Sequence, residues 1–304
     1  MASTFLILVG GYTSVISSLR FTPSTSSLTY LTQSSVGAQS PTWLSSHPTN
    51  SSIIYATQEA WGRTGAIYSL LLNPSTGSLT SKASISTGTS TSNGGAVYVE
   101  LLGDGTTLAA SNYNAGSAFM VSLGSDKLSF SGSGQVIQFS GSGPLPNQLS
   151  PHAHQSIGYN NGILVADLGS DKVRRLAKSG NTWSECGSIT FTPGSGPRHM
   201  VALNNTLYTI HENSSTLTQH TLPSLCSGSS QLVANISIIP PGTSPTSNMK
   251  GAELLYAPSP SGSSSSPLLY ASNRNDPTNS DAITVFETTP SLKAVAYVRT
   301  GLQH

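Results

Sequence analysis

The sequence predicts an all-β protein of the β-propeller class, in which small antiparallel sheets repeat around a common axis. The first observation is a six-residue pattern, a short apolar strand that ends in polar residues or glycine. Its starts lie roughly 43 to 62 residues apart, the spacing of one small sheet per repeat. The second observation is that no stretch carries sustained helical periodicity. A β-sandwich is the alternative, but it does not normally repeat one sequence register six times. The six copies begin at Ile7, Ile54, Leu108, Leu164, Leu207 and Leu269.

Further strands are predicted on both sides of these hexapeptides. Anchor strands precede them, such as SPTWLSS from Ser40, SPHAHQS from Ser150, GPRHMVA from Gly196 and KGAELLY from Lys250. Apolar strands such as AIYSLLL from Ala66 follow them, and turn signals such as Asn-Asn-Gly fill the gaps. Three or four strands per repeat predict a single propeller domain over residues 1–304, with about five complete blades plus partial strands.

Composition excludes several classes of function. Charged residues make up only 8% of the chain, and 13 Lys and Arg nearly balance 12 Asp and Glu, so we expect no nucleic-acid partner. No segment is long and apolar enough to span a membrane, and Phe5–Val9 is too short for a signal-peptide core. Cys186 and Cys226 do not make a disulfide scaffold, and whether they pair is left open. We therefore expect a cytosolic protein. Competing chemistries find little support, because the sequence lacks a Gly-x-Ser-x-Gly elbow, a Walker loop and a His-Glu-x-x-His helix. We expect no cofactor.

Equivalent positions of successive propeller blades gather around one axis, so residues that end the hexapeptides should share a cleft. His152 and His154 lie two apart on a probable strand, and their side chains should share one face. Either imidazole suits general acid/base catalysis near neutral pH. A structural histidine between blades is the alternative. A metal site is the third possibility, with Glu212 or Asp167 as a further ligand.

Cationic and acidic residues at the strand ends point to an anionic substrate. Arg198 and His199 open one anchor strand, and Arg274 ends its own hexapeptide. A guanidinium group binds a carboxylate or phosphate in a two-pronged way, which suits substrate binding. Glu212 ends the preceding hexapeptide and Glu253 lies in an anchor, so either can act as a base or orient a partner. Salt bridges between blades are the alternative for these residues.

Four short polar residues complete the candidate set. Asn112 and Asn273 offer neutral hydrogen bonds to substrate hydroxyls, although asparagine is equally ordinary in β-turns. Asp167 and Asp171 are expected to be structural, bonding the backbone of a turn in the LGSDK stretch.

Several motifs together resemble one family. They are PHAH followed by VADLGSDKV, GPRHM followed by YTIHEN, SNYNAG, and LYASNR followed by AITVF. They resemble the seven-bladed propeller lactonases, which include 6-phosphogluconolactonases and fungal 3-carboxy-cis,cis-muconate lactonizing enzymes. The resemblance runs from Leu8 to Gly301 and implies that His154 is the catalytic histidine, with Glu212 and Arg274 at family positions. A full member would continue beyond His304, so we expect the last blades to be incomplete or missing, by roughly 60 to 80 residues.

The predicted function is therefore hydrolysis of the lactone ring of a small anionic sugar acid, as in 6-phosphogluconolactonase. His154 or Glu212 would deprotonate water, and Arg198 and Arg274 would hold the anion and offset developing charge. The predicted substrate-binding residues are His152, His199, Glu253, Asn112 and Asn273. Cycloisomerisation of carboxy-cis,cis-muconate is the first alternative, because it needs the same cations and one acid/base. A non-catalytic propeller that binds a ligand or protein is the second. The oligomeric state is not predicted.

Overall fold

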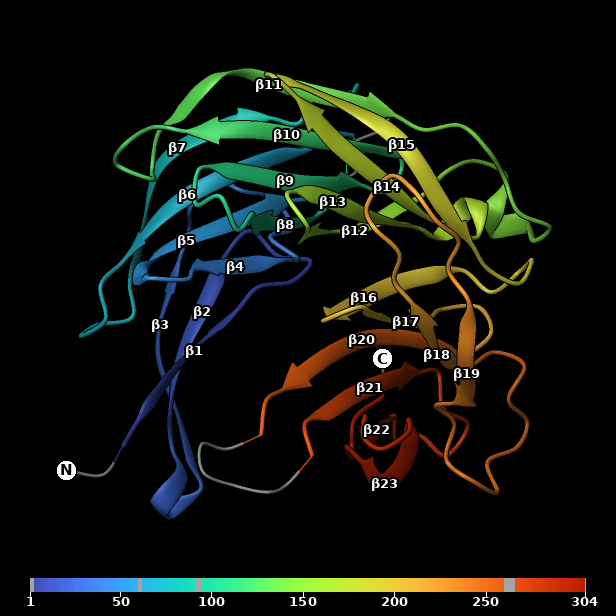
Figure 1. The fold of residues 1–304 in the computed structure, drawn as a ribbon. Helices are drawn as coiled ribbons and strands as arrows, with labels where there is room; N and C mark the ends of the chain where they lie inside the picture. The colour runs from blue at the N-terminus through green and yellow to red at the C-terminus, as the bar shows by residue number, and fades with distance from the viewer. Residues whose placement is uncertain (1–2, 60–61, 91–94, 260–265, 304) are drawn as a thin grey trace. The chain divides into compact units, whose positions relative to one another are not determined.

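The fold consists of β-strands arranged in six antiparallel sheets (Figure 1). The computed structural model describes residues 3–59, 62–90, 95–259 and 266–303. Within these residues the only helical segments are three short 3₁₀ turns, at Pro23–Thr25, Pro146–Gln148 and Leu168–Ser170. The predicted all-β class is confirmed. Among the described residues, no helix is long and apolar enough to cross a membrane.

The sheets follow one another along the chain as meanders. The first sheet has three strands, β1 (Phe5–Val9), β2 (Ile16–Thr22) and β3 (Ser27–Ser34). The second has β4 (Leu44–His47), β5 (Asn50–Gln58), β6 (Ala66–Leu72) and β7 (Leu79–Ser86). The third has β8 (Ala96–Leu101), β9 (Thr107–Asn112), β10 (Ser117–Leu123) and β11 (Phe130–Gln138).

The remaining three sheets have four strands each. The fourth has β12 (Ala153–Tyr159), β13 (Gly162–Asp167), β14 (Lys172–Ser179) and β15 (Thr182–Thr190). The fifth has β16 (Pro197–Leu203), β17 (Thr206–His211), β18 (Thr216–Thr221) and β19 (Leu232–Ser237). The sixth has β20 (Lys250–Ala257), β21 (Leu268–Arg274), β22 (Ala282–Glu287) and β23 (Lys293–Arg299).

The repeated hexapeptide marks the same strand in most of the sheets. In the five four-stranded sheets it falls on the second strand, next to the anchor strand, whereas its first copy falls on β1 at a sheet edge. Five complete sheets and one partial sheet match the predicted number of blades. The described residues form six sheets, and each repeat uses about 50 residues. The structure therefore matches the predicted seven-bladed type only in part.

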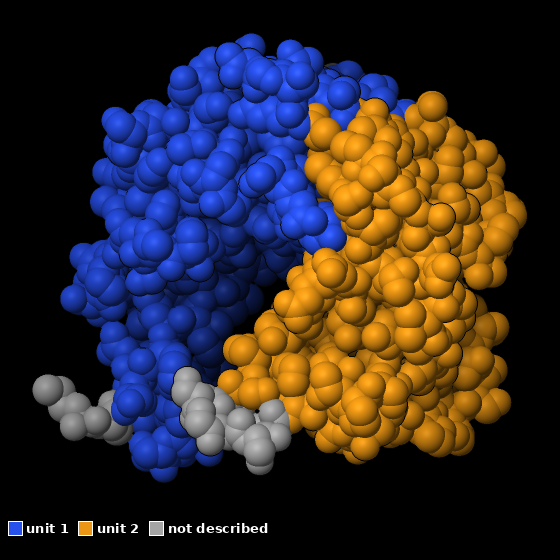
Figure 2. Space-filling view, in the orientation of Figure 1, with its two compact units in different colours: residues 1–139, 152–163, 178–184 blue, residues 140–151, 164–177, 185–304 orange. Residues whose placement is uncertain are grey.

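The chain divides into two compact units, each with its own apolar clusters (Figure 2). Unit 1 comprises residues 1–139, 152–163 and 178–184, and unit 2 comprises residues 140–151, 164–177 and 185–304. Tyr55 and Phe119 are buried in a cluster of unit 1, and Leu217 and Phe286 in a cluster of unit 2. The single domain expected from the sequence stays a prediction.

The ends of neighbouring hexapeptides meet within each unit, as the repeat predicts. In unit 1, the Tyr12 hydroxyl donates to Glu59 Oε1 at 3.1 Å. In unit 2, Arg274 donates to Glu212 Oε2 at 2.8 Å. Each pair occupies the sixth position of two successive copies, 47 and 62 residues apart. The strand ends therefore bring polar residues from distant parts of the chain together.

Candidate functional site

The centre of the candidate site in unit 2 is a carboxylate held between two guanidinium groups. Arg198 lies on β16, Glu212 follows the last residue of β17, and Arg274 ends β21. Glu212 Oε2 accepts from Arg198 Nε at 3.1 Å and from Arg274 Nη2 at 2.8 Å. Arg198 Nη1 also donates to the Ala252 carbonyl at 2.8 Å. Three of the four predicted catalytic residues are thus in direct contact.

The Arg198–Glu212–Arg274 cluster is largely buried. The three side chains are only 15%, 16% and 22% exposed for Arg198, Glu212 and Arg274, so water screens their charges incompletely. Burial, and then repulsion by Arg274, lower the pKa of Arg198, although Glu212 opposes the shift. Arg274 Nε is buried and has no hydrogen-bond partner among the described residues. Glu253 also acts electrostatically on Arg198. The two guanidinium groups offer the donor geometry that binds a carboxylate or phosphate.

A histidine–glutamate pair lies beside this cluster. His199 of β16 and Glu253 of β20 approach to 2.7 Å between Nδ1 and Oε1. Burial lowers the pKa of the His199 imidazole even though Glu253 acts to raise it. Burial acts to raise the pKa of Glu253, but His199 and Arg198 outweigh it, and the net shift is downward. A neutral imidazole that donates through Nδ1–H to a carboxylate is the favoured state. The predicted roles of both residues in substrate binding stay predictions.

A buried carboxylate fixes the segment that leads into Arg198. Asp171 accepts from the Gly194 amide at 2.7 Å and the Gly196 amide at 2.8 Å. Gly196 has φ of +67°, a left-handed conformation that favours glycine. Its carbonyl then accepts from the Glu212 amide at 2.7 Å. Asp171 is structural, as predicted, but the amides that it accepts from belong to the turn before β16 and not to the LGSDK stretch.

Asp167 also has a structural partner. Its carboxylate accepts from Arg174 Nε at 3.0 Å and Nη2 at 2.7 Å, and its predicted bond to turn backbone stays a prediction. The pair is almost fully buried, with side-chain exposures of 5% for Arg174 and 0% for Asp167. A buried carboxylate requires such a charged partner. The long arginine side chain seven residues later supplies it.

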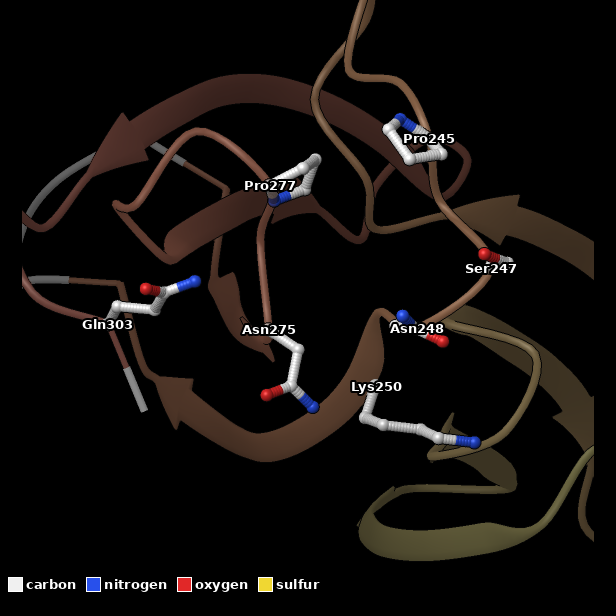
Figure 3. Close-up of a pocket in the computed structure, with 7 residues that line it drawn as sticks. All are labelled: Pro245, Ser247, Asn248, Lys250, Asn275, Pro277 and Gln303. Carbon is white, nitrogen blue, oxygen red and sulfur yellow. The ribbon is translucent and has the colours of Figure 1, made fainter.

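A polar cavity of about 620 Å³ lies at the start of β20 and just beyond the end of β21 (Figure 3). Arg198, Glu212 and Arg274 are not among its lining residues. Lys250 pairs in register with Arg274, and its Nζ donates to Asn213 Oδ1 at 3.1 Å. Asn275 and Gln303 contribute amide groups from two other segments. The sequence analysis did not select Lys250 or Asn275. Lys250 is the first residue of an anchor strand, and Asn275 directly follows Arg274. These positions in the repeat could have predicted both residues.

The histidine pair of unit 1 surrounds a tyrosine. The His152 ring stacks on the Tyr113 ring with centroids 4.5 Å apart, and its Nδ1 lies 3.1 Å from the Tyr113 carbonyl oxygen. The His154 ring meets the same tyrosine edge-on at 5.6 Å. Tyr113 ends its own hexapeptide, so both histidines contact a strand-end residue. The acid/base role of His154 and the substrate contact of His152 stay predictions.

The two predicted asparagines have structural partners. Asn112 is fully buried and donates to Ser117 Oγ at 3.1 Å. Asn273 is 3% exposed, and its Oδ1 accepts from the Ala282 amide at 2.6 Å. Their contact with a substrate stays a prediction. Within the described ranges, no group of three or more His, Cys, Asp or Glu is placed to hold a metal ion. Cys186 and Cys226 form a disulfide, which answers the question that the sequence left open.

Comparison with known proteins places this arrangement in a family. The family model described as "Lactonase, 7-bladed beta-propeller" matches residues 6–304. A 63-residue stretch is 38% identical to the 6-phosphogluconolactonase of Bacillus subtilis, covering 20% of this chain and 18% of that protein. The chain therefore aligns with only a small part of that curated relative.

Two solved structures share the fold over nearly the whole chain. A periplasmic gluconolactonase of Pseudomonas aeruginosa is 20% identical, with a TM-score of 0.84 over 99% of this chain and 85% of the other. A candidate 6-phosphogluconolactonase of Bacteroides fragilis is 22% identical, with a TM-score of 0.80 over 99% and 83%. The fold confirms a β-propeller, and the family match over residues 6–304 confirms the predicted resemblance. The chain belongs to the seven-bladed β-propeller lactonase family.

Proposed function

We propose that this protein hydrolyses the lactone ring of a small anionic sugar acid, as a lactonase of the 6-phosphogluconolactonase type. The observation that carries the proposal is the Arg198–Glu212–Arg274 cluster, in which two guanidinium groups share one carboxylate. A guanidinium group can bind a phosphate or carboxylate of the substrate through two parallel hydrogen bonds. The family match and the similarity to known lactonases support the same activity.

The proposed reaction assigns separate tasks to the predicted residues. A general base accepts a proton from water, and the water oxygen attacks the lactone carbonyl carbon. Arg198 and Arg274 bind the substrate anion and offset the negative charge that develops on the carbonyl oxygen. The ring C–O bond then breaks, and the proton passes to the departing ring oxygen, which leaves as a hydroxyl. Glu212 Oε2 already accepts from both arginines, so we assign it to orient them rather than to activate water.

Lys250 extends the proposed anion site toward the cavity. It lies opposite Arg274 on the neighbouring strand and lines the 620 Å³ cavity together with Asn275. We propose that the substrate's phosphate lies between Lys250 and Arg274. We also propose that the protein is a propeller of the seven-bladed type and a single domain, and the family match supports both. A cytosolic location remains a prediction that the Cys186–Cys226 disulfide disfavours, since disulfides are rare in that compartment.

The test measures proton release from 6-phosphogluconolactone and from uncharged δ-gluconolactone, corrected for spontaneous hydrolysis. Wild-type protein should accelerate the phosphorylated substrate. Arg274→Ala should lower kcat/KM for it at least tenfold, an effect of about 1.4 kcal/mol. The loss should be smaller for the uncharged lactone. Arg20→Ala is the matched control. Arg20 lies outside the sheets that carry the candidate site, and its side chain donates to the Ser75 carbonyl.

Two outcomes would reject this function. Absence of acceleration for both lactones would reject lactone hydrolysis. Consumption of 3-carboxy-cis,cis-muconate, followed by its ultraviolet absorbance, would identify the cycloisomerase alternative in its place.

A further inference from the structure

A second cavity, of about 270 Å³, lies on one face of the fifth sheet in unit 2. Thr218 of β18 pairs in register with Thr209 of β17 and with Asn235 of β19. Directly paired residues project to the same face of a sheet, so the three strands present one shared surface. Residues 190–195, between β15 and β16, form the other side of the cavity. None of its lining residues belongs to the Arg198–Glu212–Arg274 cluster.

Two buried imidazoles line this cavity, and each has an unused ring nitrogen. His211 is 1% exposed and His220 is 7% exposed. The Nδ1 atoms of both are buried and have no hydrogen-bond partner within the described part of the chain. Buried polar atoms are nearly always paired, and each one left unpaired costs stability. Both imidazoles belong to residues that line the cavity, so a ligand there lies beside two histidines whose Nδ1 atoms are unpaired.

The hydrogen bonds of His211 determine what its Nδ1 can bind. His211 Nε2 lies 2.8 Å from Thr218 Oγ1, and that oxygen lies 3.5 Å from the Thr209 carbonyl oxygen. A carbonyl only accepts, so the Thr218 hydroxyl donates to it and accepts from His211 Nε2–H. In this tautomer Nδ1 carries a lone pair, so it is a hydrogen-bond acceptor. Its partner must be a donor.

The surroundings of the imidazoles favour an uncharged ligand. No Asp, Glu, Lys or Arg occurs among the described residues that line the cavity. Burial lowers the pKa of His220, and burial together with His220 lowers the pKa of His211 to about 3, so both rings are neutral near pH 7. The Phe191 ring meets both imidazoles edge-on, with centroids 4.8 Å from His211 and 4.9 Å from His220. Hydroxyls such as that of Thr216 and the amide of Asn235 complete the wall.

We propose that this cavity binds a small uncharged molecule rich in hydroxyl groups, of monosaccharide or polyol size. Its hydroxyls donate to His211 and form hydrogen bonds with His220, and its C–H surface packs against Phe191. Aromatic and hydroxyl groups together suit such a molecule, which has both apolar and polar surfaces. A metal ion is less suited, because only two imidazoles and neutral oxygens line the cavity. The site is separate from the proposed lactonase site, although His211 directly precedes Glu212 in the chain.

The test uses full-length protein labelled with ¹⁵N in its histidine rings. The protein is titrated separately with D-glucose, myo-inositol and xylitol while the ring nitrogens are followed by NMR. The expected result is a saturable shift of the Nδ1 resonances of His211 and His220 with at least one of these probes. Asn235→Leu should weaken this binding at least tenfold and keep the fold, because Asn235 lies exposed at the edge of the cavity. Thr29→Val, at an exposed position of β3, should leave it unchanged.

Three results would overturn the proposal. The first is the absence of a saturable response from any of the three probes. The second is an equal response in wild type and in folded His211→Phe, which would place binding elsewhere. The third is perturbation of both Nδ1 resonances by stoichiometric Zn²⁺ alone, which would make the cavity a metal site. Circular dichroism verifies the fold of each variant, and the lactone assay is run separately so that the two proposals fail independently.

Discussion

At the scale of single residues, Glu212 connects the two arginines of the candidate site. Glu212→Gln keeps the shape of the side chain and removes the charge that both guanidinium groups share. Arg198 and Arg274 then repel each other, and we expect the free energy of unfolding to fall by about 1–3 kcal/mol. The value of kcat/KM for 6-phosphogluconolactone should fall at least tenfold, or about 1.4 kcal/mol. Urea unfolding and lactone hydrolysis measure the two effects.

Glu287→Gln is the matched control for this substitution. Glu287 pairs with Lys293 at 3.0 Å on the surface, where the lysine side chain is 57% exposed. Such a pair contributes only about 0–1 kcal/mol. If both variants lose the same stability and retain full activity, Glu212 does not organise the site.

His211 predicts how the stability of the folded protein depends on pH. Its folded-state pKa is about 3, below the ordinary value of 6.5, because burial and His220 disfavour the charged ring. As the pH falls from about 6.5 to about 3, the unfolded chain binds a proton that the folded chain does not bind, so the protein loses stability over that interval. His211→Gln should flatten this part of the stability curve, measured by urea unfolding from pH 7 to pH 4. His152→Gln, at a half-buried ring, is the control. An unchanged curve in His211→Gln would show that other groups determine the acid sensitivity.

At the scale of elements, Asp171 holds the turn before β16 and thereby the position of Arg198. Its carboxylate accepts from Gln148 Nε2 at 2.8 Å as well as from the amides of Gly194 and Gly196. Asp171→Asn removes the charge and replaces one acceptor oxygen by a donor. We expect a loss of about 1.5–3 kcal/mol, the value of a hydrogen bond to a charged group. KM for the lactone should rise as well, because Arg198 loses its fixed position. Urea unfolding and substrate titration measure both changes.

The control for the turn is Asp126→Asn. Asp126 accepts from the amides of Leu128 and Ser129 in an exposed turn of unit 1, far in sequence from Arg198. It should leave KM unchanged. A rise in KM in both variants would mean that the effect of Asp171 is not local to β16.

How far the sequence predicts these elements depends on the range of the interactions. The hexapeptides predict strands because an apolar run and its polar end are local features, and their sixth positions correctly bring Glu212 to Arg274. The residues of the second cavity could not be predicted from the sequence. His211 and His220 become neighbours only through the register of β17 with β18, and Phe191 joins them from another sheet. A single sequence does not specify that register or the burial that leaves two ring nitrogens unpaired.

At the scale of the whole molecule, the blades follow one another along the chain, and the disulfide is the single covalent link between described segments distant in sequence. It joins Cys186 of β15 to Cys226, 40 residues later, in the segment between β18 and β19. Closing a loop of this length lowers the entropy of the unfolded chain, and the chain-entropy model assigns it about 4 kcal/mol. That amount is a large part of the total stability of a typical protein, about 5–15 kcal/mol. Folded contacts persist without the bond, because Arg175 Nη1 lies 3.4 Å from the carbonyl oxygens of Ser224 and Gly228.

We therefore expect the double variant Cys186→Ser/Cys226→Ser to fold with the same circular dichroism spectrum and to unfold at a lower urea concentration. The loss acts through the unfolded state, so lactone KM should change little. Dithiothreitol should destabilise the wild type to the level of the variant and leave the variant unaffected, which separates the covalent link from the two side chains. Hydrogen exchange should rise mainly in β15 to β19, the strands within and beside the closed loop. Equal stability of the oxidised wild type and the variant would show that the unfolded chain gains no entropy when the bond is absent.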